Sequence, residues 1–153
     1  MLSRVEKIND FVVRLANVNG SGSASANRIF ARSMIRMGVP VGSRNIFPSN
    51  IQGLPTWYEV RVSGAGHLGR RGGYDLMVAM NPQTWDKDVA GIDAGGYLFY
   101  DSTKPLPSSK FREDITVVGM PLTEICNKQY SDPRQRQLFK NIMYVGALGS
   151  LLG

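Results

Sequence analysis

The chain has 153 residues, 42% of them hydrophobic and 20% charged, with a net charge of +6. This length and composition predict one soluble globular domain over residues 1–153, and the longest apolar run, residues 142–153, is too short to span a bilayer. The start of the chain has no apolar segment typical of a secretory signal, and its single cysteine excludes an internal disulfide. We therefore expect a cytoplasmic protein without a membrane segment.

The single cysteine also excludes a cysteine-ligated cluster or zinc site built by this chain alone, and one histidine cannot form a metal site without other ligands. Cys126 lies at helical spacing from Leu122, which favours a buried small hydrophobic residue. His67 lies in a glycine-rich segment, where we expect a solvent-exposed side chain. The sequence therefore predicts no metal site.

The positive charge is concentrated in the first half of the chain. Residues 1–73 contain ten Lys and Arg against three Asp and Glu, whereas residues 74–153 contain eight against nine. A basic half favours an acidic partner, which could be nucleic acid, a phosphorylated cofactor or another subunit. Nucleic acid is disfavoured because the sequence has no aromatic–basic interleaving, helix-turn-helix spacing or zinc finger.

A strand, a turn of small residues and a helix follow one another over residues 10–38. Residues 11–18 are nearly continuously apolar, as in a strand buried on both faces, and the helix is expected over residues 26–38. The glycines and serines of the turn, Gly20, Ser21, Gly22 and Ser23, allow a phosphate to approach the N–H groups at the helix start. The alternative is an ordinary loop that binds nothing.

The predicted helix has two distinct faces. Ala26, Phe30, Met34 and Met37 recur at helical spacing and are expected to be buried, and Ser23 or Ser25 is expected to cap the helix. Three arginines, Arg28, Arg32 and Arg36, recur every four residues on the opposite face. A solvated helix side explains this stripe best, and a subunit contact is the alternative.

A second strand is expected over residues 39–47. A dinucleotide-binding unit would place a carboxylate near its end to hold the ribose hydroxyls, but this region offers Arg44 and Asn45. That pattern argues against NAD and tolerates a phosphorylated ribose.

The following loop, residues 48–57, contains two prolines and lies where open α/β sheets bind ligands; a purely structural connection is the alternative. Residues 57–63 alternate as in a half-covered strand near a sheet edge.

Further strands are expected over residues 76–80, 96–101 and 115–119, and helices over residues 83–91, 121–130 and 133–153. This alternation predicts an α/β fold: a Rossmann-like three-layer sandwich with a mainly parallel sheet and helices on both faces. The last helix becomes more apolar toward Leu152. Either it packs into the domain, or a longer protein continues beyond Gly153; we favour the second.

Four segments together resemble the gamma domain of the 2-oxoacid:ferredoxin oxidoreductases, most closely the N-terminal part of the alpha subunit of the 2-oxoglutarate-type enzymes. They are VNGSGSASAN (18–27), FPSNIQGLPTWYEVRV (47–62), DLMVAMN (75–81) and KNIMYVGAL (140–148). The segments follow the same order and extend over nearly the whole chain, and the second is the most specific.

The resemblance implies a component of an enzyme that oxidatively decarboxylates a 2-oxoacid, with 2-oxoglutarate as the expected substrate, to an acyl-coenzyme A and passes electrons to ferredoxin. The gamma domain is implicated in handling coenzyme A. By position, the family's glycine-rich turn falls on residues 20–25 and its coenzyme A loop on residues 48–53. The expected contact residues are Gly20, Ser21, Gly22 and Ser23 for phosphate, Arg44 for the ribose phosphate, and Ser49, Asn50 and Gln52 for hydrogen bonds.

This sequence has Ser23 and Ser25 where the family's turn often has glycine. It also lacks the family's thiamine-binding segment and any Cys-x-x-Cys. Thiamine pyrophosphate, magnesium and [4Fe-4S] clusters are therefore expected only on partner domains or subunits. The chain contains no persuasive catalytic residue, so we expect it to be inactive alone.

Three functions compete at this point. The first is a component of the oxidoreductase, with other domains or subunits as partners and ferredoxin as the partner of the whole complex. The second is a stand-alone binding module for a nucleotide or phosphate ligand. The third is a structural subunit that docks through its arginine stripe.

Overall fold

The computed structural model describes residues 10–18, 20–46, 51, 53–67 and 72–152. Its centre is a six-stranded sheet in the order β2-β3-β1-β4-β5-β6. β3 runs antiparallel to both of its neighbours, and the other strands share one direction, which confirms the predicted mainly parallel sheet. The strands are β1 (Asp10–Val18), β2 (Val41–Ile46), β3 (Pro55–Ser63), β4 (Tyr74–Ala79), β5 (Ile92–Asp101) and β6 (Thr116–Met120).

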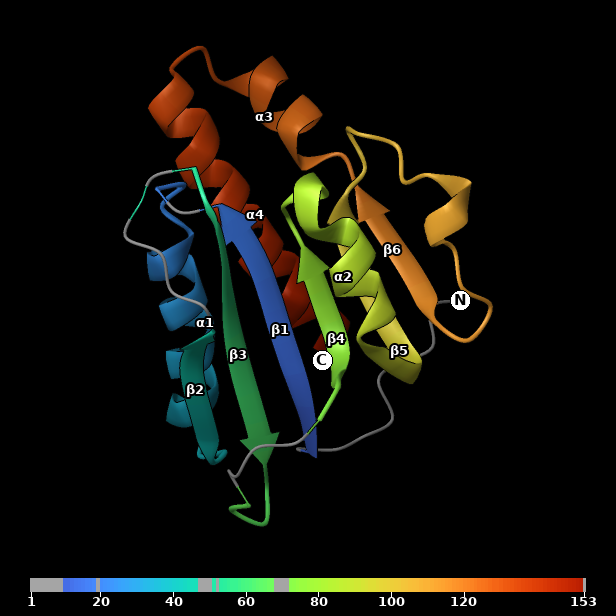
Figure 1. Cartoon of the computed structure of the whole chain (residues 1–153). Helices are drawn as coiled ribbons and strands as arrows, with labels where there is room; N and C mark the ends of the chain where they lie inside the picture. The colour runs from blue at the N-terminus through green and yellow to red at the C-terminus, as the bar shows by residue number, and fades with distance from the viewer. Residues whose placement is uncertain (1–9, 19, 47–50, 52, 68–71, 153) are drawn as a thin grey trace.

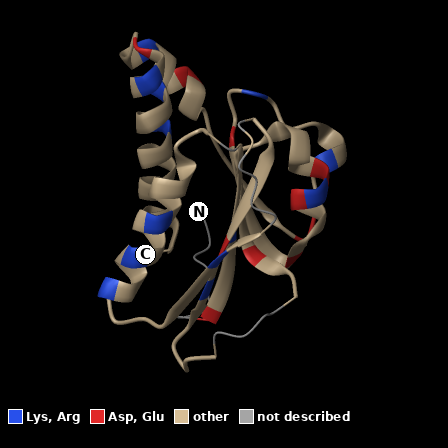
Figure 2. Cartoon of the chain, turned by 60° about the vertical axis from the view of Figure 1, so that its left-hand side comes forward, with Lys and Arg blue, Asp and Glu red and all other residues tan. Residues whose placement is uncertain are grey.

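Helices lie on both faces of this sheet, so the predicted three-layer arrangement is confirmed (Figures 1 and 2). α1 and α4 cover one face, and α2 covers part of the other. None of the described helices is long and apolar enough to cross a membrane. The helices are α1 (Ser23–Arg36), α2 (Trp85–Ala90), α3 (Leu122–Gln129) and α4 (Pro133–Leu152), with short 3-10 turns η1 (Pro82–Thr84) and η2 (Ser108–Lys110).

β1 is buried on both faces because its side chains supply two hydrophobic cores. Phe11, Val13 and Leu15 pack toward α1 and α4, while Val12 and Ala16 pack toward α2. Alternate residues of a strand point to opposite faces, so a central strand between two helix layers needs apolar residues at almost every position. This explains the continuous apolar run that predicted the strand.

β3 shows the expected alternation and lies second from the sheet edge. Val60 and Val62 are fully buried against the core under α1 and α4, and Glu59 lies on the opposite face. Glu59 is nevertheless only 4% exposed, which the alternation alone did not predict for a half-covered strand.

Two predictions about α1 are wrong. The helix begins at Ser23, its N-cap residue is Gly22, and no side chain caps it, so neither Ser23 nor Ser25 has the predicted capping role. Met37 is 74% exposed because it is the C-cap residue and lies beyond the last turn of the helix. The arginine stripe is exposed as predicted: Arg28, Arg32 and Arg36.

The apolar end of α4 packs into the domain. Tyr144 and Leu148 are fully buried, and Leu151 and Leu152 pack against the same core. Nearby in α3, the side chain of Cys126 is buried as predicted. The apolar pattern of the last helix is therefore explained by contacts within the domain.

Candidate functional site

The candidate site lies where the chain leaves β1 and β4, two neighbouring parallel strands. After β1 the chain continues into α1 on one face of the sheet, and after β4 it continues through η1 into α2 on the other face. Because the two connections diverge, a crevice opens at the carboxyl ends of these strands. Open α/β sheets bind ligands at this kind of position.

A cavity of about 260 Å³ occupies this crevice. Residues from four parts of the chain form its wall: the end of β1, the glycine turn, the residue after β4, and α4. Gly53, at the end of the predicted ligand loop, also reaches it. The lining residues are Asn17, Val18, Gly20, Ser21, Gly53, Met80, Gln137, Lys140 and Asn141.

The turn between β1 and α1 depends on its glycines. Gly20 and Gly22 have φ angles of 86° and 79°, in the left-handed region that other residues rarely adopt. The N–H of Ser21 donates to the Val18 carbonyl oxygen at 3.2 Å, which closes the turn. The Ser21 hydroxyl is buried and has no hydrogen-bond partner within the described chain, so it is a polar group suited to a ligand.

α4 holds the turn from the other side of the cavity. Asn141 Nδ2 donates to the Ser21 carbonyl oxygen at 2.9 Å, and Gln137 Nε2 donates to Asn141 Oδ1 at 3.4 Å. A Cβ atom added at Gly22 would lie 3.4 Å from Asn141 Nδ2. That distance is an ordinary van der Waals contact, so the positive φ of Gly22, rather than a lack of space, is what favours glycine at this position.

Three buried polar side chains form a hydrogen-bonded network next to the turn. Asn27 Nδ2 donates to Asn17 Oδ1 at 3.2 Å, and the Tyr144 hydroxyl donates to Asn27 Oδ1 at 2.6 Å. Burial raises the pKa of Tyr144, so its hydroxyl keeps the proton that it donates. The network ties β1, α1 and α4 together directly behind the cavity.

Lys140 gives the cavity a positive charge. Lys140 is the only charged residue among the described residues that line the cavity. The others are glycines, asparagine and glutamine, a serine, and two apolar residues. The first N–H groups of a helix lack partners within the helix, and its N-terminus is electropositive. A cation, amide donors and the start of α1 together suit an anion such as phosphate.

The structure brings together two of the four predicted turn residues at the cavity. Gly20 and Ser21 line it, Gly22 is exposed next to them, and Ser23 is buried in the first turn of α1. The predicted loop contacts, Ser49, Asn50 and Gln52, lie outside the described residues.

Arg44 does not line this cavity. Its Nη2 and Nε donate to Glu59 Oε1 at 2.9 and 3.2 Å, on the face of the sheet that carries α2. Contact between Arg44 and a ribose phosphate stays a prediction, and such a contact would compete with Glu59 for the guanidinium.

The residues from α4 were missed as site residues by sequence reasoning. Gln137, Lys140 and Asn141 lie more than a hundred residues from the turn, and no local pattern links the two segments. One signal was present: Lys140 begins KNIMYVGAL, a segment that carried the family resemblance.

Comparison with known proteins agrees with this architecture. The family model described as pyruvate ferredoxin/flavodoxin oxidoreductase matches residues 12–153. No match was found among curated proteins.

Three solved structures share the fold. The 2-oxoglutarate:ferredoxin oxidoreductase from Magnetococcus marinus, solved with 2-oxoglutarate, coenzyme A and succinyl-CoA bound, is 25% identical with a TM-score of 0.78 over 94% of this chain. The gamma subunit of a keto/oxoacid ferredoxin oxidoreductase from Geobacter sulfurreducens is 21% identical, with a TM-score of 0.70 over 92% of this chain and 76% of its own. A pyruvate oxidoreductase subunit, PORC, from Thermotoga maritima is 15% identical, with a TM-score of 0.56 over 88% and 93%.

The chain spans 24% of the Magnetococcus marinus polypeptide that it matches. The family match covers nearly the whole chain, and the predicted resemblance to the gamma domain is confirmed. This chain therefore belongs to the pyruvate ferredoxin/flavodoxin oxidoreductase family, as a domain of the 2-oxoacid:ferredoxin oxidoreductase gamma type.

Proposed function

We propose that this chain binds coenzyme A as a component of a 2-oxoacid:ferredoxin oxidoreductase that acts on 2-oxoglutarate. The observation that carries the proposal is the cavity at the glycine turn, with Lys140 in its wall and the unpartnered Ser21 hydroxyl beside it. Further support comes from the relative at 25% identity, whose structure holds coenzyme A and succinyl-CoA.

The residues present fit a phosphorylated ligand. Coenzyme A carries a diphosphate and a ribose phosphate, so it needs cations and hydrogen-bond donors. Lys140 would compensate one phosphate charge, the Ser21 hydroxyl would donate to a phosphate oxygen, and Gly20 would let that oxygen approach the backbone. Asn141 acts through the turn, since its amide already donates to the Ser21 carbonyl oxygen.

Within the whole enzyme, this chain would position coenzyme A, whose thiol receives the acyl group. Thiamine pyrophosphate with magnesium would supply the decarboxylation chemistry, and [4Fe-4S] clusters would carry electrons to ferredoxin, all on partner domains or subunits. We therefore propose that the isolated chain binds coenzyme A without turning over a 2-oxoacid, and that it acts in the cytoplasm.

Calorimetric titration of the chain with coenzyme A tests this function. Lys140→Gln should weaken binding by about tenfold or more, because a hydrogen bond to a charged group contributes about 1.5–3 kcal/mol, and the effect should shrink with added salt. Lys128→Gln is the matched control, because Lys128 lies in α3 outside the cavity lining and forms an exposed pair with Glu124. The control should change the affinity less than twofold.

Two results would contradict the proposal. No binding of coenzyme A by the chain would refute its ligand-binding function, and equal affinities for the Lys140→Gln and Lys128→Gln variants would refute this cavity as the site. Comparison with dephospho-coenzyme A, which lacks the ribose phosphate, decides the role of Arg44. If Arg44 contacts that phosphate, Arg44→Ala should weaken coenzyme A and leave dephospho-coenzyme A unchanged.

A further inference from the structure

The outer side of α1 carries exposed arginines together with exposed large apolar side chains. Arg28, Arg32 and Arg36 follow one another every four residues, and all three are exposed. Ile29 and Ile35 are 57% and 53% exposed, and the helical repeat places them on either side of the arginine stripe. We call these five residues the α1 surface. It lies opposite the side of α1 that packs into the core.

The three arginines have no acidic partner within the described chain. α1 contains no Asp or Glu (Figure 2), and the ion pairs of the described residues do not include Arg28, Arg32 or Arg36. Like charges four residues apart on a helix repel one another and destabilise it. The charges of the α1 surface therefore oppose the folding of the helix that carries them.

α3 has the charge pattern that is usual for an exposed helix. Glu124 and Lys128 lie four residues apart, and Lys128 Nζ donates to Glu124 Oε1 at 2.8 Å. Opposite charges at this spacing stabilise a solvated helix. Solvation alone therefore leaves the uncompensated arginines of α1 unexplained.

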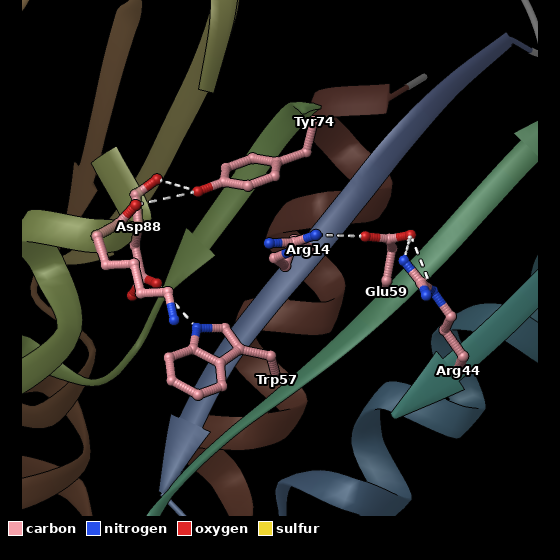
Figure 3. A network of polar contacts seen from close by, with 7 residues as sticks. Arg14, Arg44, Trp57, Glu59, Tyr74 and Asp88 are labelled. Atoms are coloured by element: carbon pink, nitrogen blue, oxygen red, sulfur yellow. Dashed lines mark hydrogen bonds and ion pairs between the residues drawn. The ribbon is translucent and has the colours of Figure 1, made fainter. Parts of the chain in front are cut away.

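The arginines of the sheet differ from those of α1 because carboxylates of the same chain compensate them. Arg14 Nη2 donates to Glu59 Oε2 at 2.7 Å, and Arg44 Nη2 donates to Glu59 Oε1 at 2.9 Å, so that Glu59 lies between two guanidinium groups (Figure 3). Arg61 Nη1 donates to Asp10 Oδ1 at 2.7 Å. Among the described arginines of the basic first half, those of the α1 surface are the ones left for an acidic partner.

The composition of the α1 surface is typical of a protein interface. Arg is enriched at interfaces and Lys is depleted, and every basic residue of α1 is an Arg. A guanidinium binds a carboxylate through two parallel hydrogen bonds, and Ile29 and Ile35 offer apolar area that a partner can cover. The matching surface therefore has carboxylates next to apolar side chains.

Two other occupants fit this surface less well. In a symmetric dimer of this chain, each copy would present the same patch, so arginines would face arginines. A helix that binds a membrane buries its apolar face among the lipid chains, but the apolar side of α1, with Ala26 and Phe30, already packs into the core. An acidic protein surface is the occupant that complements both the charge and the apolar residues.

Other parts of an oxidoreductase are available as this partner in a relative. The chain spans 24% of the Magnetococcus marinus polypeptide that it matches, so most of that relative lies outside the gamma-type domain. We propose that the α1 surface binds an acidic surface of another domain or subunit of the same oxidoreductase. The proposal rests on the proposed function only in requiring that the chain works within a larger enzyme.

The test is titration of this chain into the remaining domains or subunits of its oxidoreductase. Arg28→Gln/Arg32→Gln should weaken binding by about tenfold, which is about threefold for each lost ion pair. Added salt should weaken the unchanged chain more than this variant. Gln has nearly the helix propensity of Arg, so urea denaturation should show no loss of stability, and the loss of binding cannot then be assigned to unfolding.

A matched control removes the same charge from another part of the molecule. Lys104→Gln/Lys128→Gln changes two exposed residues outside α1 and should change the affinity less than twofold. Ile29→Ala keeps the charge of the α1 surface and removes apolar area, so it should weaken binding by about threefold with no change in the salt dependence.

Three results would overturn the proposal. Equal affinities for the α1 and control double variants would refute a role of the α1 surface in assembly. A dimer of this chain that Arg28→Gln/Arg32→Gln dissociates would assign the surface to a second copy. Binding to phosphatidylserine vesicles that this variant abolishes, without any change in its affinity for the rest of the enzyme, would assign the surface to a membrane.

Coenzyme A affinity separates this proposal from the proposed function. The α1 variants should bind coenzyme A as the unchanged chain does, because no residue of the α1 surface is among the described residues that line the cavity at the glycine turn. If coenzyme A does not bind while the α1 variants still weaken assembly, only the proposed function is refuted. If coenzyme A binds and the α1 variants assemble normally, only the present proposal is refuted.

Discussion

On the side of α1 and α4, buried apolar side chains such as Leu15 and Leu148 fill the space against the sheet. On the side of α2, the same central strands present Arg14 and Glu59 in a row that no described helix covers. The first face contains its polar groups as a small internal network behind the glycine turn. The second presents charged groups beside a cavity lined in part by Arg14, Trp57 and Tyr74.

This difference indicates that the two faces have different roles, one in the stability of the fold and the other in interaction. Apolar burial stabilises the fold in proportion to the area removed from water, so the closed face should dominate the free energy of unfolding. A charged pair that remains partly hydrated contributes less to folding, and its charges remain able to orient a partner. Substitutions on the two faces should therefore differ in their effect on the free energy of unfolding.

The largest effect is expected on the closed face. Leu148→Ala removes a fully buried side chain from the core and should lower the free energy of unfolding by about 2–5 kcal/mol. Leu138→Ala is the control in the same helix, because Leu138 is 56% exposed and should change stability by about 0.5 kcal/mol or less. Urea denaturation measures both, and similar losses would show that α4 does not form the core as described.

A smaller effect is expected in the charged row. Glu59→Gln leaves two guanidinium groups without their shared carboxylate and should cost about 2 kcal/mol, since both arginines keep contact with water. Glu124→Gln breaks only the exposed pair with Lys128 and should cost at most about 0.5 kcal/mol. A loss for Glu59→Gln that exceeds the loss for Leu148→Ala would contradict the division between the faces.

The smallest effect concerns the pH dependence of the α2 side. Burial, together with the nearby Asp88 charge, raises the pKa of Tyr74 from 10.0 to about 12. Folding therefore favours the protonated phenol, and this contribution to stability is complete below about pH 10 and is lost as the pH rises toward 12. Between about pH 8 and about pH 11, the free energy of unfolding should fall less steeply for Tyr74→Phe than for the unchanged chain. Parallel curves would mean that the Tyr74 phenol titrates normally.

Much of the secondary structure could be predicted because its signals are local. The apolar run of β1 and the alternation of β3 each reflect neighbours within a few residues. The order of the strands could not be predicted in this way. β3 inserts antiparallel between β1 and β2, whereas local periodicity indicates only that a segment is a strand and not which strand lies beside it.

The candidate site could likewise be predicted from the sequence only in part. Gly20 and Ser21 were predicted as ligand contacts because a turn of small residues before a helix has known physical consequences, and the structure places both at the cavity. Met37 was expected to be buried because helical periodicity was extended beyond the last turn of α1. Lys140 was missed because a lysine in a helix is usually solvated, and only its position next to the turn suggests a ligand.

For this protein, the sequence by itself determined the conformations of short segments, since backbone preferences depend on each residue and its nearest neighbours. It also determined the family resemblance, through segments distributed in order along the chain. The tertiary structure decided which segments meet: α4 lies against a turn 120 residues earlier in the chain, and Arg14 shares a carboxylate with Arg44. These contacts follow from the packing of apolar faces across the whole sheet, which no short window of sequence contains.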